Sequence, residues 1–137
     1  MSVEFAQVIP MLRIFNVEKA RDFYLHFLGF KLDWANDGEG RAPMYMQVSR
    51  GDLVLHLTEH YADCTPGSNV YVIIEGIEEF HRELGSRRYK YMRPGLRKAP
   101  WNATIMEVVD PFGNRIRFSE SLKDNVAAPD VKVGQKG

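Results

Sequence analysis

Aromatic, amide and charged side chains recur at every second position along several segments, where they alternate with apolar residues. Successive strand residues point to opposite faces of a sheet, so this alternation predicts one apolar face and one face of mixed chemistry. A mixed face of this kind is typical of a partly enclosed ligand cleft, although a face covered by a dimer partner would also fit. Its predicted members are Met11, Arg13, Tyr45, Gln47, Val54, His56, Thr58, Asn69, Tyr71, Ile73, Ile105, Glu107, Arg115 and Arg117.

The spacing of reactive residues does not indicate nucleophilic catalysis, because neither a Ser/His/Asp nor a Cys/His pattern is present. His56 and His60 lie four residues apart, which on a strand separates them by roughly 13 Å, too far to share a metal ion. The one cysteine, Cys64, excludes an internal disulfide and fits a reducing cytoplasm. We interpret Cys64 as a loop residue and assign no catalytic residue.

The elements that must position these side chains are clearest in the stretch Val8–Phe30. Its pattern predicts a strand over Phe5–Ile14 and a helix over Val17–Leu28 with one apolar stripe. Asn16 is placed to cap the start of this helix, and Gly29 is placed to end it.

The same order of elements returns 60 residues later, and the offset becomes 61 after one extra turn residue. We interpret this repeat as two β-α-β-β-β modules, residues 1–60 and 61–121, in an α+β fold with curved mixed sheets around a cleft. Residues 122–137 have no apolar periodicity and are expected to form a mobile tail. Matching positions include Leu12 with Val72, Ile14 with Ile74, Met46 with Met106, Gln47 with Glu107, His56 with Arg117 and Leu57 with Phe118.

The remaining elements follow from alternation and turn residues. The second helix is predicted over Ile77–Leu84, and Arg93–Pro100 is a basic, proline-containing loop. Further strands are predicted over Phe30–Ala35, Met44–Ser49, Leu53–Glu59, Asn69–Glu75, Arg88–Met92, Asn102–Val109 and Arg115–Glu120. The predicted core beneath the two helices consists of Leu12, Ile14, Met46, Val48, Leu53, Leu55, Leu57, Val70, Val72, Ile74, Met106, Val108, Ile116 and Phe118.

Composition limits the partners of the chain. Eighteen basic and eighteen acidic side chains balance in 137 residues, which argues against binding to nucleic acid through counterion release. We find neither an apolar run long enough to cross a membrane nor a signal-peptide pattern. We therefore expect a cytoplasmic protein without a nucleic-acid or membrane partner.

Several motifs resemble the vicinal oxygen chelate superfamily, which includes glyoxalase I, extradiol dioxygenases, fosfomycin-modifying enzymes and bleomycin resistance proteins. These are the run Lys19–Tyr24, the following Leu28-Gly-Phe30, and Asp110-Pro-Phe-Gly-Asn114. Val8–Leu12 and Ala99-Pro-Trp101 look most like the bleomycin resistance branch. The resemblance covers Val3–Glu120 and implies a homodimer with a ligand crevice at or near the subunit interface.

The resemblance also bears on metal binding. Metal-dependent members of the superfamily place His, Gln or Glu at positions that correspond here to Ile9, His56, Asn69 and Arg117. Only one imidazole remains, and a guanidinium would repel a cation, whereas catalytic zinc usually takes three protein ligands. The resemblance therefore implies no metal and no cofactor. A register shifted to Gln7 or Glu59 would restore donors, but a one-residue slip would turn the core face outward.

A protein that sequesters a drug needs flat surfaces and matched charge rather than an activated water. Trp34 and Trp101 are candidate stacking faces, and Glu107, Asp33, Asp37 or Glu39 are candidate partners for a cation. Arg13, Arg115 and Arg117 would instead suit a carboxylate, and Asn102 stands where the family usually has glycine after Trp.

These residues predict a metal-free protein of the bleomycin resistance type, which sequesters a planar or charged antibiotic-like ligand in a dimer cleft. The alternatives are a metal-dependent glyoxalase, dioxygenase or thiol transferase of the same superfamily, and an interaction module whose cleft serves only dimerisation. The predicted ligand-binding residues are Trp34, Tyr45, Gln47, His56, Tyr71, Trp101, Glu107, Arg115 and Arg117.

Overall fold

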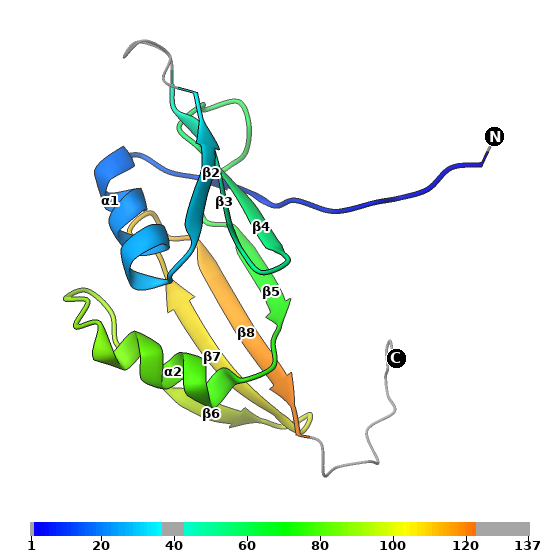
Figure 1. Cartoon of the computed structure of the whole chain (residues 1–137), viewed down its shortest axis with the longest axis vertical. Helices are drawn as coiled ribbons and strands as arrows, with labels where there is room; N and C mark the ends of the chain where they lie inside the picture. The colour runs from blue at the N-terminus through cyan, green and yellow to red at the C-terminus, as the bar shows by residue number, and fades with distance from the viewer. Residues whose placement is uncertain (1, 37–42, 123–137) are drawn as a thin grey trace. The chain divides into compact units, whose positions relative to one another are not determined.

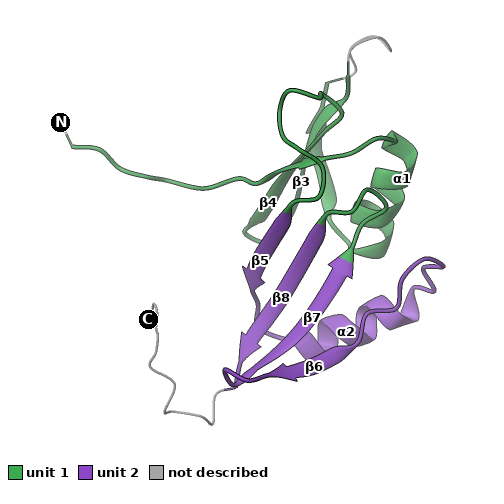
Figure 2. Ribbon diagram, turned by 180° about the vertical axis from the view of Figure 1, so that it is seen from behind, with its two compact units in different colours: residues 1–68, 109–114 green, residues 69–108, 115–137 purple. Residues whose placement is uncertain are grey.

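The computed structural model describes residues 2–36 and 43–122 and divides the chain into two compact units (Figure 2). Unit 1 comprises residues 1–68 and 109–114, and unit 2 comprises residues 69–108 and 115–137. Each unit contains a four-stranded sheet with one parallel strand pair, together with one helical segment. The predicted α+β class with two repeated modules is confirmed. The predicted module limits, 1–60 and 61–121, stay a prediction.

Unit 1 contains the sheet β1-β4-β3-β2, with β1 parallel to β4 and the other pairs antiparallel. A helical segment lies against one face of this sheet (Figure 1). The elements in chain order are β1 (Met11–Arg13), α1 (Val17–Arg21), η1 (Asp22–Phe27), β2 (Lys31–Ala35), β3 (Tyr45–Arg50) and β4 (Leu53–Thr58).

The first helix begins as predicted, because the Asn16 side chain accepts a hydrogen bond from the Lys19 amide at 2.8 Å. Its second half, η1, widens to a π-helix, a change that the 3.6-residue apolar spacing does not predict. The Leu28 amide, for example, donates to the Phe23 carbonyl at 2.9 Å, five residues back. Gly29 follows with a φ of 80° and ends the helix as predicted.

The predicted turn Asp110–Asn114 belongs to unit 1 and is fixed to it by a buried carboxylate. The Tyr24 hydroxyl donates to Asp110 Oδ2 at 2.6 Å, and the Asn114 side-chain amide donates to the same oxygen at 2.8 Å. The other oxygen, Oδ1, accepts from the backbone amides of Phe112 and Asn114. Asn114 also donates to the Arg13 carbonyl, so the turn is joined to both η1 and β1. Burial and the Asp110 carboxylate raise the pKa of Tyr24.

Unit 2 contains the sheet β5-β8-β7-β6, with β5 parallel to β8. Helix α2 packs on β8, where Phe80 meets Phe118 edge to face at 5.1 Å. The Glu120 carboxylate accepts hydrogen bonds from the Gly76 and Ile77 amides and so caps this helix from β8. The elements are β5 (Asn69–Ile73), α2 (Ile77–Ser86), β6 (Leu96–Ala99), β7 (Ala103–Val109) and β8 (Arg115–Ser121).

Most of the predicted core is confirmed as buried. The buried members are Leu12, Ile14, Met46, Val48, Leu55, Leu57, Met106, Val108, Ile116 and Phe118. Val70, Val72 and Ile74 are only half-buried because they lie on or next to β5, the edge strand of its sheet. Leu53 is half-buried because it follows directly after the β3–β4 turn.

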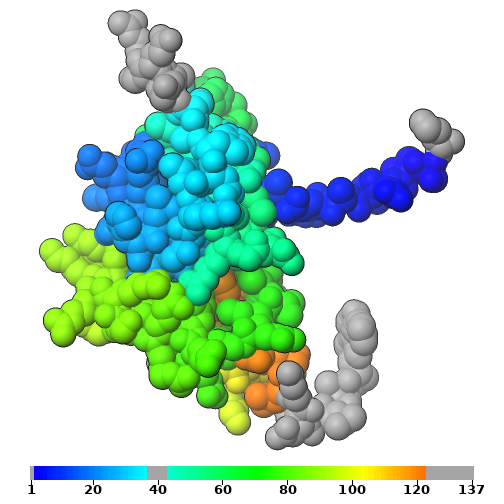
Figure 3. Space-filling view, in the orientation of Figure 1, coloured from blue at the N-terminus to red at the C-terminus, as the bar shows by residue number. Residues whose placement is uncertain are grey.

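One predicted strand, Phe5–Ile14, was too long, and another was wrong. The first strand is confined to β1, and the apolar residues before it, Val3, Phe5 and Val8, are 79%, 97% and 88% exposed. Figure 3 shows this N-terminal segment standing clear of the rest of unit 1. Alternation alone predicted a strand there, but a strand also needs a neighbour to pair with.

The strand that was wrong is Arg88–Met92, which forms turns. Arg88 has a φ of 54°, a left-handed conformation that does not occur in a strand. The strand of this region is β6, which starts only after Pro94-Gly95 and lies inside the predicted loop Arg93–Pro100. Its register pairs Leu96 with Met106 and Ala99 with Ala103.

Two members of the predicted mixed face are buried instead. Ile105 is fully buried in a small apolar cluster with Ala99 and Ala103. Thr58 is fully buried because its hydroxyl is used inside a turn, where it donates to Asp63 Oδ2 at 2.7 Å and accepts from the His60 amide. Neither residue is available to a ligand on the sheet surface.

Candidate functional site

The mixed face of unit 1 is built on one row of residues that crosses all four strands. Strand register pairs Met11 with His56, His56 with Gln47, and Gln47 with Trp34. Tyr45 lies two residues before Gln47 on β3 and therefore on the same face. We call Asp33, Trp34, Tyr45, Gln47 and His56 the unit 1 face.

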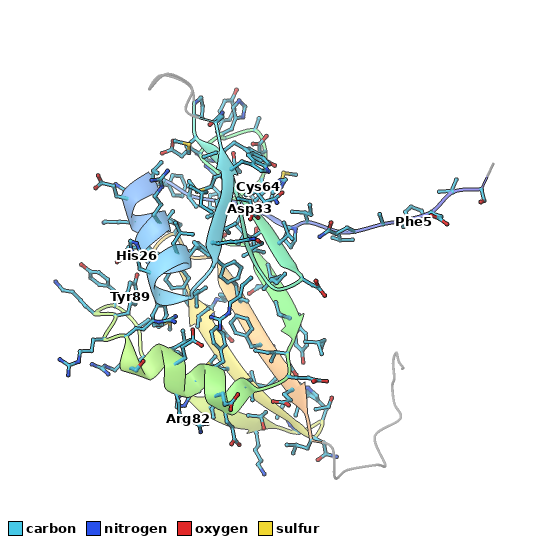
Figure 4. All side chains as sticks on the ribbon, in the orientation of Figure 1. Phe5, His26, Asp33, Cys64, Arg82 and Tyr89 are labelled. Carbon is cyan, nitrogen blue, oxygen red and sulfur yellow. The ribbon has the colours of Figure 1, made fainter. Side chains whose placement is uncertain are left out.

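An irregularity in β2 explains why both Asp33 and Trp34 belong to this face. The register of β2 with β3 shifts between Leu32 and Trp34, which leaves Asp33 as an extra residue. A β-bulge of this kind lets two consecutive side chains point the same way. Asp33, labelled in Figure 4, consequently approaches Gln47, while Trp34 covers Tyr45.

Three rings of the unit 1 face pack on one another. The Trp34 indole stacks nearly parallel to the Tyr45 ring, with 5.9 Å between centroids and 7° between planes. The His56 imidazole meets both rings edge to face, at 5.4 Å from Trp34 and 5.1 Å from Tyr45. Trp34 is still 46% exposed, so much of the indole remains open to solvent.

A chain of hydrogen bonds runs through the same residues. The distances are 2.6 Å from the Tyr45 hydroxyl to His56 Nδ1, 2.9 Å from His56 Nε2 to Gln47 Oε1, and 3.0 Å from Gln47 Nε2 to Asp33 Oδ2. Because an amide oxygen can only accept, His56 Nε2 carries the hydrogen, and in the neutral ring Nδ1 accepts from the Tyr45 hydroxyl. This chain of hydrogen bonds fits a neutral His56.

The electrostatics agree with this assignment. Burial lowers the pKa of His56 below its ordinary 6.5 and raises the pKa of the Tyr45 phenol, to which the nearby Asp63 carboxylate also contributes. The hydrogen bond from Gln47 lowers the pKa of Asp33, which is ionised at neutral pH. Lys31 Nζ lies 3.9 Å from Asp33 Oδ1, but the lysine side chain is largely exposed.

Unit 2 carries a charged counterpart on its own sheet. Tyr71 on β5 pairs in register with Arg117 on β8. Glu107 on β7 accepts from Arg115 at 2.7 Å and from Arg117 at 3.3 Å. The hydrogen bond from Arg115, followed by the contribution of Arg117, lowers the pKa of Glu107 below 4.5. We call Tyr71, Glu107, Arg115 and Arg117 the unit 2 face.

Trp101 lies in the turn between β6 and β7 of unit 2 and is 52% exposed, so it is not a core residue. Asn102, which follows it, has a φ of 61°. This left-handed conformation favours glycine and is tolerated by asparagine. The structure thus explains why asparagine can stand where glycine was expected.

The structure brings together four of the nine predicted ligand-binding residues on the unit 1 face and four on the unit 2 face, while Trp101 lies in a turn outside both. Asp33 was predicted only as one of several anionic candidates, because the sequence carries no sign of the bulge. Two other candidates, Asp37 and Glu39, lie outside the described residues, as does the predicted tail beyond Leu122. Arg13 has its guanidinium 4.5 Å from the Phe15 ring centroid, where the cation lies over the aromatic face.

The residues at the positions implied for metal binding do not fit a metal ion. Ile9 has no donor, both ring nitrogens of His56 are hydrogen-bonded, and Arg117 is a cation. Glu59, the candidate for a shifted register, accepts from the Met44 amide at 3.0 Å. Within residues 2–36 and 43–122, no group of three or more His, Cys, Asp or Glu side chains is placed to hold a metal ion.

The helices of the described residues are all too short or too polar to cross a membrane.

Among solved structures, a bleomycin-binding protein complexed with bleomycin matches with a TM-score of 0.66 and 23% identity, covering 86% of this chain and 100% of that chain. A bleomycin resistance determinant encoded on the transposon Tn5 matches with a TM-score of 0.67 and 23% identity, covering 85% and 98%.

A bleomycin-binding protein from bleomycin-producing Streptomyces verticillus, complexed with copper(II)-bleomycin, matches with a TM-score of 0.65 and 25% identity, covering 88% and 100%. Comparison with curated proteins finds no match. The family model described as "Glyoxalase superfamily protein" matches residues 1–125. The resemblance inferred from the sequence is confirmed, and the chain belongs to the glyoxalase superfamily.

Proposed function

We propose that this chain is a metal-free small-molecule binding protein of the bleomycin resistance type, which sequesters a planar, charged, antibiotic-like ligand. The observation that supports this proposal best is the half-exposed Trp34, held flat by Tyr45 and edge-on by His56. A flat, fixed aromatic surface binds planar rings at little cost in conformational entropy, because the side chain is already ordered.

The unit 1 face also supplies charge. A heteroaromatic ring stacked on Trp34 would contribute about 0.5–1.5 kcal/mol beyond the area it buries. Asp33, ionised and hydrogen-bonded to Gln47 beside that indole, would attract a cationic group of the same ligand. Lys31 would have to leave Asp33, which costs little because exposed ion pairs are weak.

The unit 2 face would recognise polar groups rather than stack. Both arginines already bind Glu107, so a ligand carboxylate would have to compete with that residue. Arg115 is about half-exposed and has donors left over, since a guanidinium carries five N–H groups. Tyr71, which is 50% exposed, offers a ring next to them. We therefore propose that this face contacts polar or anionic parts of a ligand.

The alternative function is a metal-dependent enzyme of the same superfamily. Such an enzyme needs a metal ion that polarises the substrate or activates water. The hydrogen bonds that occupy both nitrogens of His56 speak for a wall residue rather than a ligand. Stoichiometric Zn, Mn, Ni or Fe in protein purified without a chelator would overturn the proposal in favour of the enzyme.

We also propose that the protein is a cytoplasmic homodimer. Two of the segments that expose large apolar side chains support this proposal, the N-terminal segment with Val3, Phe5 and Val8, and the strand β5 with Tyr71 and Ile73. Exposed apolar side chains that lie next to one another often mark a protein interface. Light scattering coupled to size exclusion would show twice the mass of 15.8 kDa, and a strictly monomeric protein at high concentration would contradict this part of the proposal.

The binding proposal is tested by titrating metal-free bleomycin into chelator-treated protein and following heat release and thermal unfolding. We expect saturable binding and a melting temperature that rises with the logarithm of ligand concentration. A second titration uses aromatic carboxylates and tests whether the arginines of the unit 2 face determine which ligand binds. If none of these compounds shifts the melting temperature, the interaction module without a ligand becomes the better account.

A further inference from the structure

The connection between α2 and β6 in unit 2 is longer and far more basic than its counterpart in unit 1. Nine residues, 87–95, separate Ser86 from Leu96, whereas three residues, 28–30, separate Phe27 from Lys31. The chain as a whole has no net charge, yet residues 81–98 hold seven basic residues and one acidic residue, Glu83. The basic residues are Arg82, Arg87, Arg88, Lys90, Arg93, Arg97 and Lys98.

A partly open cavity of about 170 Å³ lies between the end of α2 and this connection. His81, Arg88, Tyr89 and Arg93 contribute polar groups to its lining, while Leu84 and Met92 contribute apolar ones. Figure 4 shows Tyr89 in this loop, with nitrogen-tipped side chains around it. The lining holds no acidic residue.

The two arginines of the lining, Arg88 and Arg93, differ from Arg87, the first residue of the connection. Arg87 binds Glu83 at 2.6 Å and is thereby neutralised. Within the part of the chain that the structure describes, neither Arg88 nor Arg93 has a carboxylate partner. Tyr89 and Tyr91 pack edge to face at 5.6 Å, and Lys90 lies over the Tyr91 ring, so the loop has its own aromatic support.

We infer that the cavity lined by Arg88 and Arg93 is a binding site for a small organic anion with a phosphate or carboxylate head group. Two unpaired guanidinium groups in one lining provide charge and parallel N–H donors for such a head group. Leu84 and Met92 would cover a short apolar part of the same molecule. The volume fits a small acid rather than a drug-sized ligand, whose sites usually take about 300–1,000 Å³.

This site is separate from the function proposed above, since none of its residues belongs to the unit 1 face or the unit 2 face. A basic cluster after a helix also has a simpler explanation, because cations stabilise the C-terminal end of a helix. The two explanations predict different behaviour at Arg88. Its φ of 54° favours glycine, so glycine at this position relieves the backbone while removing the guanidinium.

The test is an NMR titration of the full chain with inorganic phosphate, phenyl phosphate and benzoate, which follows the backbone amides. We expect saturable shifts confined to residues 81–94, with phenyl phosphate and benzoate binding more tightly than inorganic phosphate. Arg88→Gly and Arg93→Gln should each weaken binding about tenfold, whereas the matched control Arg97→Gln, outside the lining, should change it less than about twofold. Arg88→Gly should keep or raise the melting temperature without ligand.

Three results would overturn the inference. Shifts that never saturate, or that Arg97→Gln reduces as much as Arg93→Gln, would indicate general attraction to positive charge. A lower melting temperature for Arg88→Gly with unchanged anion affinity would show that the arginine serves only the helix end. A DNA duplex that shifts the same amides more strongly than phenyl phosphate would identify a polyanion surface instead of a small-molecule site.

Discussion

The same positions of the two repeated modules carry different chemistry. Gln47 and His56 in unit 1 correspond to Glu107 and Arg117 in unit 2, at offsets of 60 and 61 residues. Each pair joins neighbouring strands through a side-chain contact, at 2.9 Å in unit 1 and 3.3 Å in unit 2. The contact is neutral in unit 1 and an ion pair in unit 2. The two modules therefore share a side-chain contact between neighbouring strands at this position, but different chemical groups make it.

Neighbouring positions follow the same division. Tyr45 of unit 1 is half-buried and supports Trp34, whereas its counterpart Ile105 is fully buried. Unit 1 consequently presents the open Trp34 ring, supported by Tyr45 and His56, with Asp33 as the one charged member of its face. Unit 2 presents charges that largely satisfy one another. The difference suggests that stacking depends on unit 1 and that unit 2 adds polar selectivity, a division of labour that the following predictions test.

The largest expected effect concerns the turn that joins β7 to β8, compared with the turn that joins β3 to β4. Asp110→Ala leaves the Tyr24 hydroxyl and the amides of Phe112 and Asn114 without their acceptor, so unfolding free energy should fall by about 3 kcal/mol. Asp52→Ala, in the exposed β3–β4 turn, is the matched control and should change it by less than about 0.5 kcal/mol. Urea unfolding measures both, and equal losses would contradict the assigned role of the buried carboxylate.

The next effect separates the two tryptophans. Trp34→Ala should weaken the binding of metal-free bleomycin by about 30-fold, or about 2 kcal/mol, because it removes the stacking surface. Trp101→Ala should weaken binding less, since that indole lies in a turn outside the rows of both faces. Isothermal titration of each variant decides the order. The reverse order would move the stacking role to unit 2.

A smaller effect is expected from the ion pair of unit 2. Glu107→Gln should lower stability at neutral pH by about 0.5–1 kcal/mol, because the arginines are partly exposed and the pair is screened. The folded-state pKa of Glu107 lies below 4.5, so its contribution is present above that pH and is lost as the pH falls. Unfolding of the variant should therefore lose part of its acid dependence below pH 4.5. An unchanged acid profile would contradict the pairing.

The smallest expected effect tests whether His56 of unit 1 is neutral. The pKa of His56 lies below 6.5, so its neutral form stabilises the fold above that pH and this contribution is lost as the pH falls. Gln47→Glu places a carboxylate beside the imidazole, as Glu107 lies beside Arg117, and should raise the pKa of His56. NMR titration of the His56 ring protons measures the change. A variant with an unchanged or lower pKa would contradict the proposed hydrogen-bond chain.

The repeat made much of the fold predictable, because periodic apolar positions and the capping residue Asn16 are local signals. Alternation also placed Gln47 and His56 on the same face of the sheet, whereas their direct pairing is a finding of the structure. The bulge at Asp33 did not, since an extra residue in an edge strand leaves no mark in the apolar pattern. Likewise the contact of Tyr24 with Asp110, 86 residues away, depends on packing rather than on spacing. The strand β6 was missed because apolar and polar residues alternate less clearly in Leu96–Ala99 than in the basic segment Arg88–Met92 before it.

The chain has two tryptophans, and this makes its central claim directly measurable by fluorescence. Trp101→Phe leaves Trp34 as the sole indole, and Trp34→Phe leaves Trp101. We predict that metal-free bleomycin, added to chelator-treated protein, quenches the Trp101→Phe variant in a saturable way. Quenching that appears only after Zn, Mn, Ni or Fe is added, or only in the Trp34→Phe variant, would contradict a metal-free stacking site on unit 1.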